Sequence, residues 1–339
     1  MSRVLVMMSG GVDSSVAAAV LQEQGHEVTG VTLKLWGGES DSGCCSAADV
    51  EDARRVAAQL GIPHYVFNFT DDFDTNVVAP YVDSYSAGET PNPCVECNRT
   101  MKFGRLLERA DQLGFEEVAT GHHARVVDTP RGRAIGRGAD AAKDQSYVLY
   151  MLGRREIDRT RLPIGEMTKT EVRERAHALG LRTAAKQESM DVCFITRGGR
   201  SAFLGNRIER RPGSIVDAQG AVVGAHDGID AFTIGQRRGT GVAVGERRYV
   251  VDIEPSSATV TLGTRDELLR DRVELRDVSF VIPPPADVTV QTRAHGDPVP
   301  ARLAGDTIVF GSPQPRVAAG QVVACYDGDV LLGGGIARA

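Results

Sequence analysis

The sequence predicts an α/β fold with a doubly wound parallel sheet in the first part of the chain, followed by two small all-β modules. Two observations predict the sheet: strand and helix patterns alternate up to about residue 125, and a glycine-rich turn follows the first strand. The modules are predicted because short β-branched runs, separated by Gly, Asp and Pro, dominate from about residue 205 onward.

The composition is that of a globular protein with two or three domains: 339 residues, 42% hydrophobic and 25% charged. The net charge of −6 argues against an indiscriminate nucleic-acid binder but permits a local basic surface. Six cysteines are too few for a disulfide framework in a chain of this length. We find neither a signal peptide nor a membrane-length apolar run, and therefore expect a cytoplasmic protein that does not engage a membrane.

The first predicted strand, residues 4–8, leads into the segment SGGVDSS at residues 9–15, which opens a helix. Two adjacent glycines let the backbone approach a ligand closely, and the N–H groups at a helix N-terminus favour an anion. Val12, Val16 and Val20 recur at helical spacing, and Gly25 ends the helix. The segment therefore predicts a phosphate-binding loop.

The loop lacks the lysine of the GxxxxGK[ST] motif, which argues against a kinase or a GTPase. Asp13 would place a carboxylate beside bound phosphates, and that arrangement requires a neighbouring cation such as a metal ion. The alternative is an ordinary first-turn Asp that the helix dipole favours. The sequence leaves both interpretations open.

Further strands and helices continue the alternation. We predict strands at residues 27–35, 64–69 and 116–120 and helices at residues 47–60 and 101–113. In open α/β sheets, ligands bind beyond the carboxyl ends of the strands, where the phosphate loop, residues 34–36 and Gly121-His122 would lie. A capping box at residues 168–171 predicts a further helix that ends at Leu179.

The β-branched runs divide into two modules. They occupy residues 214–216, 248–253, 258–262, 273–281, 306–310 and 321–326. A change of texture near residue 205 and a second break at residues 264–272 mark the boundaries. We predict an α/β domain at residues 1–204, a central small β domain at residues 205–268 and a C-terminal β-barrel-like domain at residues 269–339.

Two cysteine neighbourhoods are candidates for chemistry. Pro91 and Pro93 place Cys94 and Cys97 on a loop ahead of a helix start, where N–H groups and nearby basic side chains would lower a thiol pKa. A zinc site that combines this pair with Cys44 and Cys45 is the alternative, but adjacent cysteines lack the usual two-residue spacing. Cys193 lies among apolar residues, and its sequence context fits a core position as well as a reactive thiol.

Basic residues form several clusters in an otherwise acidic chain. Such clusters suit a phosphate backbone, although a single cluster is usually a solvated face. His122 and His123 follow the predicted strand end and fit either phosphate binding or an ordinary polar position. The clusters are Arg131 to Arg137 with Lys143, Arg154 to Arg161, Arg207 to Arg211, and Arg237-Arg238.

Taken together, these segments resemble the tRNA-specific 2-thiouridylases over essentially the whole chain. The loop at residues 9–14 is similar to the pyrophosphatase-type loop of many ATP-adenylating enzymes and identifies only that superfamily. Four segments are more specific and occur in the family's order. They are TPNP to CN at residues 90–98, ATGH at residues 119–122, KDQSY at residues 143–147 and CFI at residues 193–195.

The resemblance implies an adenine-nucleotide α-hydrolase-like fold and a two-step reaction. ATP with Mg²⁺ would adenylate the 2-oxo group of the wobble uridine of tRNA, and sulfur would then displace AMP. The implied partners are tRNA and a persulfide sulfur donor, such as a cysteine desulfurase or a sulfur-relay protein.

The family's functional positions carry over residue by residue. Cys97 matches the nucleophile and Cys193 the cysteine that holds a persulfide, and no residue matches a metal site. The ATP positions are Met8, Ser9, Gly10, Gly11, Val12, Asp13, Ser14, Leu33 and Gly121. Positions near the target base or the tRNA are Asn92, Pro93, Cys94, His122, Lys143, Asp144, Gln145, Arg293, Ala294 and Gln321.

Two positions depart from the family's pattern. Cys94 stands where the family often has Asp, and a thiol does not replace that charge at neutral pH unless its pKa is lowered. Ala294 stands where a tyrosine is expected, which removes a stacking surface. A disulfide between Cys97 and Cys193 on turnover would need Cα atoms about 4.4 to 6.8 Å apart. If they lie farther apart at rest, loop movement around Gly198-Gly199 is implied.

Two other functions remain as alternatives. The first is an adenylating enzyme with the same loop that uses ammonia or an amine instead of sulfur, as GMP synthetase-like proteins do. The second is a non-catalytic nucleotide-binding or thiol-sensing protein whose β modules bind a partner. Neither alternative accounts for both cysteine segments and the carboxyl-terminal modules.

Overall fold

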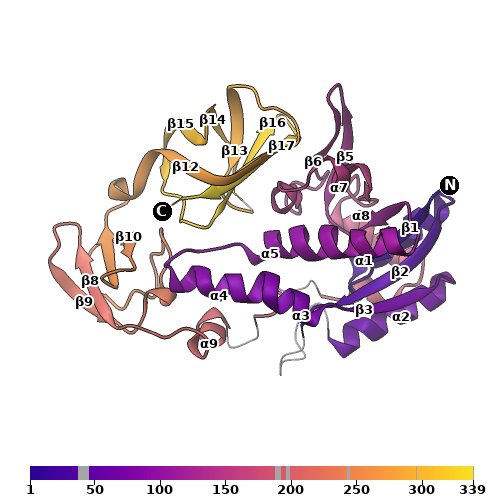
Figure 1. The fold of residues 1–339 in the computed structure, drawn as a ribbon, viewed down its shortest axis with the longest axis horizontal. Coiled ribbons are helices and arrows are strands. Elements are labelled where there is room, and N and C mark those ends of the chain that lie inside the picture. The colour runs from indigo at the N-terminus through magenta and orange to yellow at the C-terminus, as the bar shows by residue number, and fades with distance from the viewer. Residues whose placement is uncertain (37–45, 188–191, 196–198, 243–244, 295, 339) are drawn as a thin grey trace.

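A computed structural model describes residues 1–36, 46–187, 192–195, 199–242, 245–294 and 296–338, which form three sheets with helices around the first (Figure 1). The first sheet belongs to the α/β part, the second is a small central sheet, and the third is closed into a barrel. No helix within these ranges is long and apolar enough to cross a membrane.

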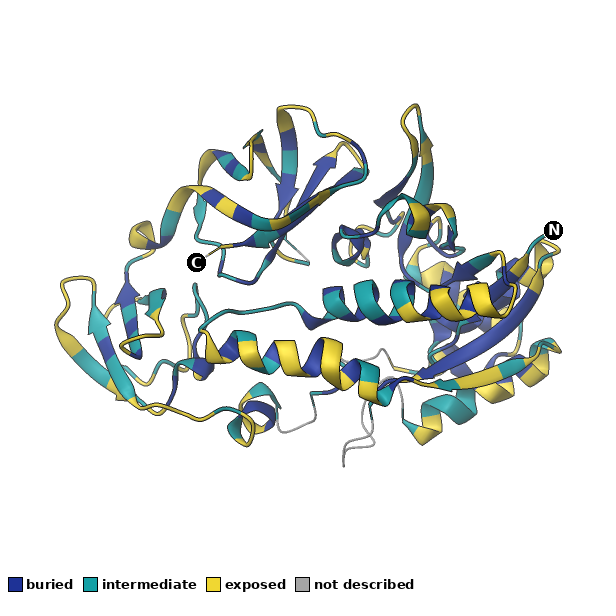
Figure 2. Cartoon of the chain, in the orientation of Figure 1, coloured by how far each residue is buried: buried dark blue, intermediate teal, exposed yellow. Residues whose placement is uncertain are grey.

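The first sheet is parallel throughout and has the strand order β3-β2-β1-β4-β7. Its central strands are fully covered, whereas β3 is an exposed edge, as Figure 2 shows by the contrast between β2 and β3. The strands are β1 (Arg3–Met7), β2 (Glu27–Lys34), β3 (His64–Asn68), β4 (Glu117–Ala119) and β7 (Thr160–Arg161).

Helices cover both faces of this sheet, which confirms the predicted doubly wound fold. Val4 and Val6 of β1 belong to one hydrophobic cluster, with side chains of α1, α2 and α8. Leu5, between them, points to the other face and a second cluster built from the helices that follow β3. The first group is α1 (Val12–Glu23), α2 (Ala47–Leu60) and α8 (Lys169–Ala178).

The second group contains a long helical segment that begins earlier than predicted. It runs through α5 (Pro93–Glu96), the π-helical η2 (Cys97–Arg105) and α6 (Leu106–Gln112). It begins at Pro93 instead of Met101, because proline is compatible with the first helical position and Asn92 accepts a hydrogen bond from Cys94 N at 3.1 Å. The expectation that Cys94 and Cys97 lie on a loop ahead of the helix was therefore wrong.

Shorter elements complete the α/β part and the connection to the modules. Before the long helix lie α3 (Thr70–Phe73), η1 (Asp74–Val78) and α4 (Ala79–Ser86). Later elements are η3 (Ser146–Leu149), α7 (Arg154–Asp158), η4 (Arg182–Ala185), α9 (Gly199–Gly205), η5 (Ile229–Ala231) and η6 (Asp266–Leu268).

The central sheet has the order β10-β11-β8-β9 and its own small core around Ile215, Phe232 and Val250. Three of its strands match predicted β-branched runs. The strands are β8 (Gly213–Asp217), β9 (Val222–His226), β10 (Tyr249–Glu254) and β11 (Thr259–Gly263).

The third sheet closes on itself, because β12 pairs with β15 on one side and with β17 on the other. The closed order is β12-β15-β14-β13-β16-β17, so the barrel has no exposed edge between these strands. They are β12 (Leu269–Phe280), β13 (Asp287–Gln291), β14 (Val299–Ala304), β15 (Thr307–Pro315), β16 (Val322–Asp327) and β17 (Val330–Ala337).

A hairpin from the α/β part extends this barrel, and the sequence did not predict it. The hairpin consists of β5 (Ala124–Thr129) and β6 (Gly132–Arg137), and β6 pairs with the start of β17. The pairing brings Ile135 opposite Leu331. The first part of the chain is therefore hydrogen-bonded to the last.

Candidate active site

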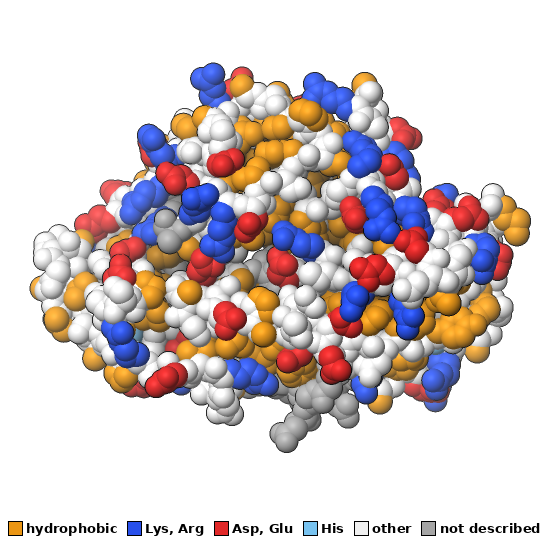
Figure 3. Space-filling model, in the orientation of Figure 1, with side chains coloured by type: hydrophobic (Ala, Val, Ile, Leu, Met, Phe, Trp, Pro, Cys, Tyr) orange, Lys and Arg blue, Asp and Glu red, His pale blue; other side chains and the backbone are white. Residues whose placement is uncertain are grey.

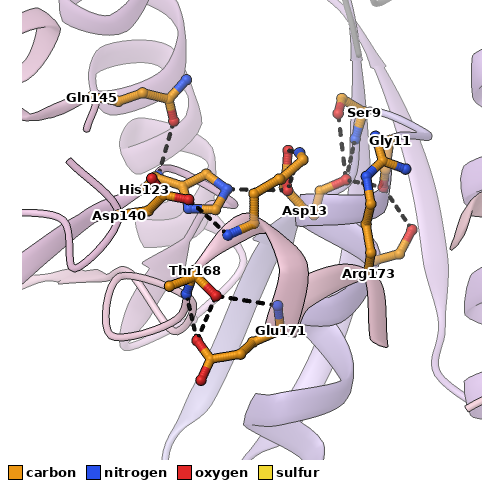
Figure 4. A network of polar contacts seen from close by, with 12 residues as sticks. Ser9, Gly11, Asp13, His123, Asp140, Gln145, Thr168, Glu171 and Arg173 are labelled. Carbon is orange, nitrogen blue, oxygen red and sulfur yellow. Dashed lines mark hydrogen bonds and ion pairs between the residues drawn. The ribbon is translucent and has the colours of Figure 1, made fainter. Parts of the chain in front are cut away.

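The phosphate loop is folded by its own side chains between β1 and α1 (Figure 4). Ser14 Oγ accepts a hydrogen bond from Ser9 N at 3.1 Å and donates one to the Gly11 carbonyl at 3.2 Å. Gly10 has φ of +73°, and a Cβ there would collide with the Asp49 carbonyl. Gly11 is the N-cap residue of α1 and makes no side-chain hydrogen bond to the first helical turn, whose N–H groups point back toward the loop.

Three other predicted nucleotide residues lie around this loop. A Cβ on Gly121 would come within 2.6 Å of Ser14 N, so the segment after β4 passes directly over the first turn of α1. Met8 is buried, and its carbonyl accepts a hydrogen bond from Thr32 Oγ1 at 2.7 Å. Leu33 is buried near the carboxyl end of the adjacent strand. The structure thus gathers the predicted residues at one edge of the sheet.

Asp13 forms an ion pair with a lysine that the sequence analysis did not assign to the site. Lys169 Nζ lies 2.6 and 2.7 Å from the two carboxylate oxygens, and His123 Nε2 lies 3.2 Å from one of them. Burial raises the pKa of Asp13, but the hydrogen bonds from His123 and Lys169 and the charge of Lys169 outweigh it, so the pKa lies below its ordinary value. The cation that Asp13 requires is thus present in the chain itself.

A second lysine binds the loop on the side of α2. Lys186 Nζ donates to the Gly10 carbonyl at 3.0 Å and binds Asp49 and Asp52 at 2.6 and 2.7 Å. Burial lowers the pKa of Lys186, but the hydrogen bonds and charges of the two carboxylates raise it by more. In the sequence, Lys169 stood inside the capping box at residues 168–171, which was interpreted only as a helix start. No sequence signal identified Lys186.

The two histidines after β4 have different surroundings. His122 is 6% exposed, hydrogen bonds with Thr120 Oγ1 at 2.7 Å, and has a pKa well below its ordinary value because of burial and the positive charge of Lys102. It is therefore neutral at physiological pH. His123 connects the loop to the next segment: its backbone N–H donates to Gln145 Oε1 at 2.9 Å, and its ring contacts Asp13.

Cys97 and Cys193, the two predicted catalytic thiols, pack against one hydrophobic cluster. Cys97 is buried there, and Cys193 is half-buried against the same cluster. Phe194, the neighbour of Cys193, is fully buried, with its ring centroid 5.4 Å from that of Tyr81. Cys94 is half-buried in the first turn of the long helix.

The zinc alternative involves Cys44 and Cys45, which lie outside the described residues. Within the described ranges, no group of three or more Cys, His, Asp and Glu side chains has the geometry of a metal site. Cys325 belongs to the barrel core, and burial raises the pKa of its thiol to about 12. That residue is therefore structural.

Arg137 connects the predicted tRNA positions at residues 143–145 to those in the barrel loop at residues 293 and 294. Arg137 donates to Asp144 at 3.0 Å and to Gln291 Oε1 at 2.8 Å. Gln291 in turn donates to the backbone carbonyls of Arg293 and Ala294 at 2.9 and 3.0 Å. Residues 143–145, from the α/β part, therefore lie next to the barrel loop that carries the late positions.

Asp144 and Gln321 are both held by intramolecular contacts. Asp144 is buried and accepts hydrogen bonds from the backbone N–H groups of Gly138 and Ser146, in addition to Arg137. Gln321 donates to the Thr90 carbonyl at 2.5 Å, just before Asn92 and Pro93. The barrel thus touches the segment that leads into the long helix.

One of the predicted basic clusters is largely structural. Arg155 and Arg159 both bind Asp111 at 2.5 Å, Arg161 binds Glu117 at 2.5 Å, and Arg154 donates to backbone carbonyls, one of them on Val281 of the barrel side. On the face shown in Figure 3, Lys and Arg side chains are interspersed with Asp and Glu. This arrangement does not form a continuous basic surface on that face.

The fold consists of a parallel α/β part with a glycine-rich turn after its first strand, followed by a small sheet and a closed barrel. The family model described as the tRNA methyl transferase HUP domain matches residues 2–197. Models described as the tRNA methyl transferase PRC-barrel domain and the aminomethyltransferase β-barrel domain match residues 201–264 and 270–337.

Comparison with known proteins then specifies the family. The chain is 47% identical to the tRNA-specific 2-thiouridylase MnmA of Roseiflexus sp. (strain RS-1), with 100% of both chains covered. It is 48% identical to the enzyme of the same name from Chloroflexus aggregans, covering 100% of this chain and 99% of that one. The chain therefore belongs to the tRNA-specific 2-thiouridylase family, a family of tRNA sulfurtransferases.

Solved structures show more distant similarity. A 4-thiouridine synthetase in complex with RNA and ATP is 18% identical, with a TM-score of 0.38, covering 61% of this chain and 46% of that chain. The U34-tRNA thiolase NcsA from Methanococcus maripaludis is 17% identical, also with a TM-score of 0.38, covering 60% of this chain and 63% of that chain.

Proposed function

We propose that this protein uses ATP to convert the 2-oxo group of the wobble uridine of tRNA into a 2-thio group. The observation that carries the proposal is the position of Cys97 and Cys193. These residues are 96 positions apart in the sequence, yet they pack against the same cluster, to which Leu33 and Leu35 from the nucleotide end of the sheet also belong. Full-length identity of 47% to a 2-thiouridylase supports the same assignment.

In the first step, the uridine O2 attacks the α-phosphorus of ATP, and the bond to the α,β-bridging oxygen breaks. Pyrophosphate leaves with the electron pair, and the uridine carries AMP on O2. The N–H groups at the start of α1 are suited to the phosphates, because an anion at a helix N-terminus is stabilised by the helix dipole and by direct hydrogen bonds. Adenylation converts a poor leaving oxygen into a good one.

In the second step, the terminal sulfur of a persulfide on Cys193 attacks C2 of the uridine, and AMP leaves with the C–O electron pair. The thiolate of Cys97 then attacks Cys193 Sγ and breaks the S–S bond to the transferred sulfur. The products are 2-thiouridine and a disulfide between the two cysteines, because the transferred sulfur is reduced as the Cys97 thiolate is oxidised. A thiol reductant restores both cysteines, and a persulfide donor reloads Cys193.

Mg²⁺ fits this reaction as a companion of the ATP phosphates. The carboxylates that border the loop, Asp13, Asp49 and Asp52, all bind lysine ammonium groups. A protein cage of carboxylates is therefore not what would hold the ion, and coordination through the phosphates is the arrangement that Mg²⁺ usually adopts with nucleotides. When bound, the ion neutralises phosphate charge.

The experiment that tests the function is mass spectrometry of nucleosides from tRNA incubated with the protein, ATP, Mg²⁺ and a persulfide donor. We expect 2-thiouridine, together with AMP and pyrophosphate in equal amounts. An enzyme that uses ammonia or an amine would give a product without sulfur that does not depend on cysteine. Absence of 2-thiouridine, with a donor shown to be active on another acceptor, would count against the proposal.

A further inference from the structure

The first turn of α1 has an unusual charge arrangement for an anion site. Asp13 is at the second position of the helix, next to the N–H groups that would receive phosphate. A bare carboxylate there would repel a triphosphate, since two unit charges 4 Å apart interact by about 4 kcal/mol at an effective dielectric constant of 20. The pairing with Lys169 at 2.6 and 2.7 Å removes this repulsion.

Lys169 is held in place by the backbone of its own helix. It is the first residue of α8, whose capping box is complete: Thr168 Oγ1 accepts from Glu171 N at 3.3 Å, and Thr168 N donates to Glu171 at 2.6 Å. The backbone N–H of Lys169 donates to Asp140 at 2.9 Å. The side chain is only 12% exposed. The long, flexible side chain reaches across to Asp13 in α1. Figure 4 shows the capping residues Thr168 and Glu171 and, above them, Asp13.

Lys169 and Lys186 occupy different places relative to the loop. The ammonium of Lys186 has three donors, and its three acceptors are the Gly10 carbonyl and the carboxylates of Asp49 and Asp52. It supports the loop from the side of α2. The ammonium of Lys169 instead lies at the carboxylate of the first turn of α1, so an anion bound to that turn comes to lie beside it.

We propose that Lys169 is a catalytic residue that binds the β- or γ-phosphate of ATP and supplies the positive charge that the lysine-free loop lacks. On nucleotide binding, the ammonium turns part of its hydrogen bonding from Asp13 to a phosphate oxygen. This assignment rests on the proposed function in one respect, that the reaction of ATP releases pyrophosphate. It does not depend on the later transfer of sulfur.

The charge of Lys169 matters most when the bond to the α,β-bridging oxygen breaks. The electron pair of that bond goes to the pyrophosphate, whose negative charge increases in the transition state. An ammonium fixed next to the departing pyrophosphate stabilises the transition state more than the ground state. Such interactions raise the rate of the chemical step. Asp13 keeps the ammonium in place before ATP arrives.

The test compares ATP with AMP, because AMP has no β- or γ-phosphate. We measure the dissociation constants of both nucleotides, and the rate of pyrophosphate release with tRNA, for the wild type, Lys169→Met and Lys169→Arg. Arg175→Met is the matched control: it removes a cation from the same helix, where Arg175 is exposed and pairs with Glu23. Thermal unfolding verifies that each variant is folded.

Lys169→Met is expected to weaken ATP binding at least tenfold relative to AMP binding and to slow pyrophosphate release on the order of 10²-fold. Lys169→Arg should retain part of both, and Arg175→Met should match the wild type. An unchanged ratio of ATP to AMP affinity in folded Lys169→Met would overturn the assignment. The wild type's ability to make 2-thiouridine is measured separately, so failure of the proposed function does not affect this ratio.

The double variant Asp13→Asn with Lys169→Met separates a catalytic lysine from one that only neutralises Asp13. If neutralisation were the whole role, removing both charges would restore ATP affinity and the rate of pyrophosphate release. We expect the double variant to remain as impaired as Lys169→Met in pyrophosphate release. Full recovery would overturn the catalytic assignment.

Discussion

The described thiols differ in their surroundings, and the difference distinguishes a packed core cysteine from the two predicted catalytic cysteines. Cys325 lies in the barrel core, where burial raises its thiol pKa to about 12, so no thiolate is present at neutral pH. Cys97 and Cys193 instead lie at one hydrophobic cluster that extends to the nucleotide end of the sheet. In the proposed reaction, such an apolar wall would exclude water from the adenylated uridine.

Replacing either predicted catalytic cysteine should abolish thiolation while the predicted nucleotide site stays intact. Cys97→Ser and Cys193→Ser remove the sulfur but keep the size of the side chain, and neither residue belongs to the phosphate loop. We expect no 2-thiouridine from either variant, and an ATP dissociation constant within about twofold of the wild type. The control is Cys325→Ala, which should thiolate tRNA once folded. Full activity of either serine variant would refute the assigned roles.

His122 should make the protein less stable in mild acid. Its pKa in the folded state lies well below the ordinary value of 6.5, so between these two values the unfolded chain binds one proton more than the folded chain. The free energy of unfolding therefore falls as the pH drops below 6.5, by at most about 1.4 kcal/mol per pH unit from this residue. Above that range the effect of His122 is absent.

His122→Asn tests this dependence, since Asn does not titrate and its amide can replace Nδ1 toward Thr120. We expect urea unfolding midpoints of the wild type to fall more steeply than those of the variant between pH 7.5 and 5.5. Parallel curves would show that the imidazole is not kept neutral by the fold.

At the scale of elements, the long helix at residues 93–112 shows what sequence patterns capture and what they miss. The apolar spacing around Phe103, Leu106 and Leu107 predicted its middle correctly. The two prolines were interpreted as helix breakers, although a proline at the first helical position leaves no hydrogen bond unmade. The π-helical stretch Cys97–Arg105 could not be predicted, because no residue type or short spacing marks where i→i+5 hydrogen bonds replace the usual i→i+4 bonds.

The N-cap of this helix should be a measurable part of its stability. Asn92 Oδ1 accepts a hydrogen bond from Cys94 N at 3.1 Å, and substituting such a cap with Ala usually costs about 0.5 to 2 kcal/mol. Asn92→Ala should lower the free energy of unfolding by that amount. Asn92→Asp should retain most of it, because Asp is an equally good N-cap. Equal losses in the two variants would mean that the cap is not the cause.

For the whole molecule, the fold class could be predicted from the sequence, but the pairing of β6 in the α/β part with β17 of the barrel could not. Alternating patterns predicted the parallel sheet, and β-branched runs predicted several strands of the barrel. The pairing of Ile135 with Leu331 joins residues 196 positions apart, and neither strand indicates its partner in its own sequence. The site roles of Lys169 and Lys186 were missed for the same reason, because their partners in the loop lie more than 150 positions away. The division into three domains at residues 204 and 268 stays a prediction.

Besides the β6–β17 pairing, the barrel contacts the α/β part at the segment before the long helix, which passes beneath the barrel in Figure 1. Thr90 N donates to the Ala319 carbonyl at 2.7 Å, and Gln321 donates back to the Thr90 carbonyl. Glu89 binds Arg276 of β12 with both oxygens, at 2.6 and 2.7 Å. The barrel therefore fixes the backbone that leads into Asn92, and through it the position of the helix that carries Cys97.

The Glu89–Arg276 pair should couple the two parts more strongly than an ordinary surface ion pair. A double-mutant cycle of Glu89→Gln and Arg276→Met measures this coupling, with Glu51→Gln and Arg55→Met on the exposed face of α2 as the control pair. Exposed pairs one helical turn apart contribute about 0.3 to 0.5 kcal/mol. We expect a coupling of at least about 1 kcal/mol between Glu89 and Arg276, because the geometry is bidentate and Glu89 is largely buried.

The Glu89 and Arg276 variants should also thiolate tRNA more slowly at an unchanged ATP affinity, since the disturbed segment leads to Cys97 and not to the phosphate loop. A coupling no larger than that of the control pair, with normal thiolation, would show that the barrel does not position the helix of Cys97 through this contact.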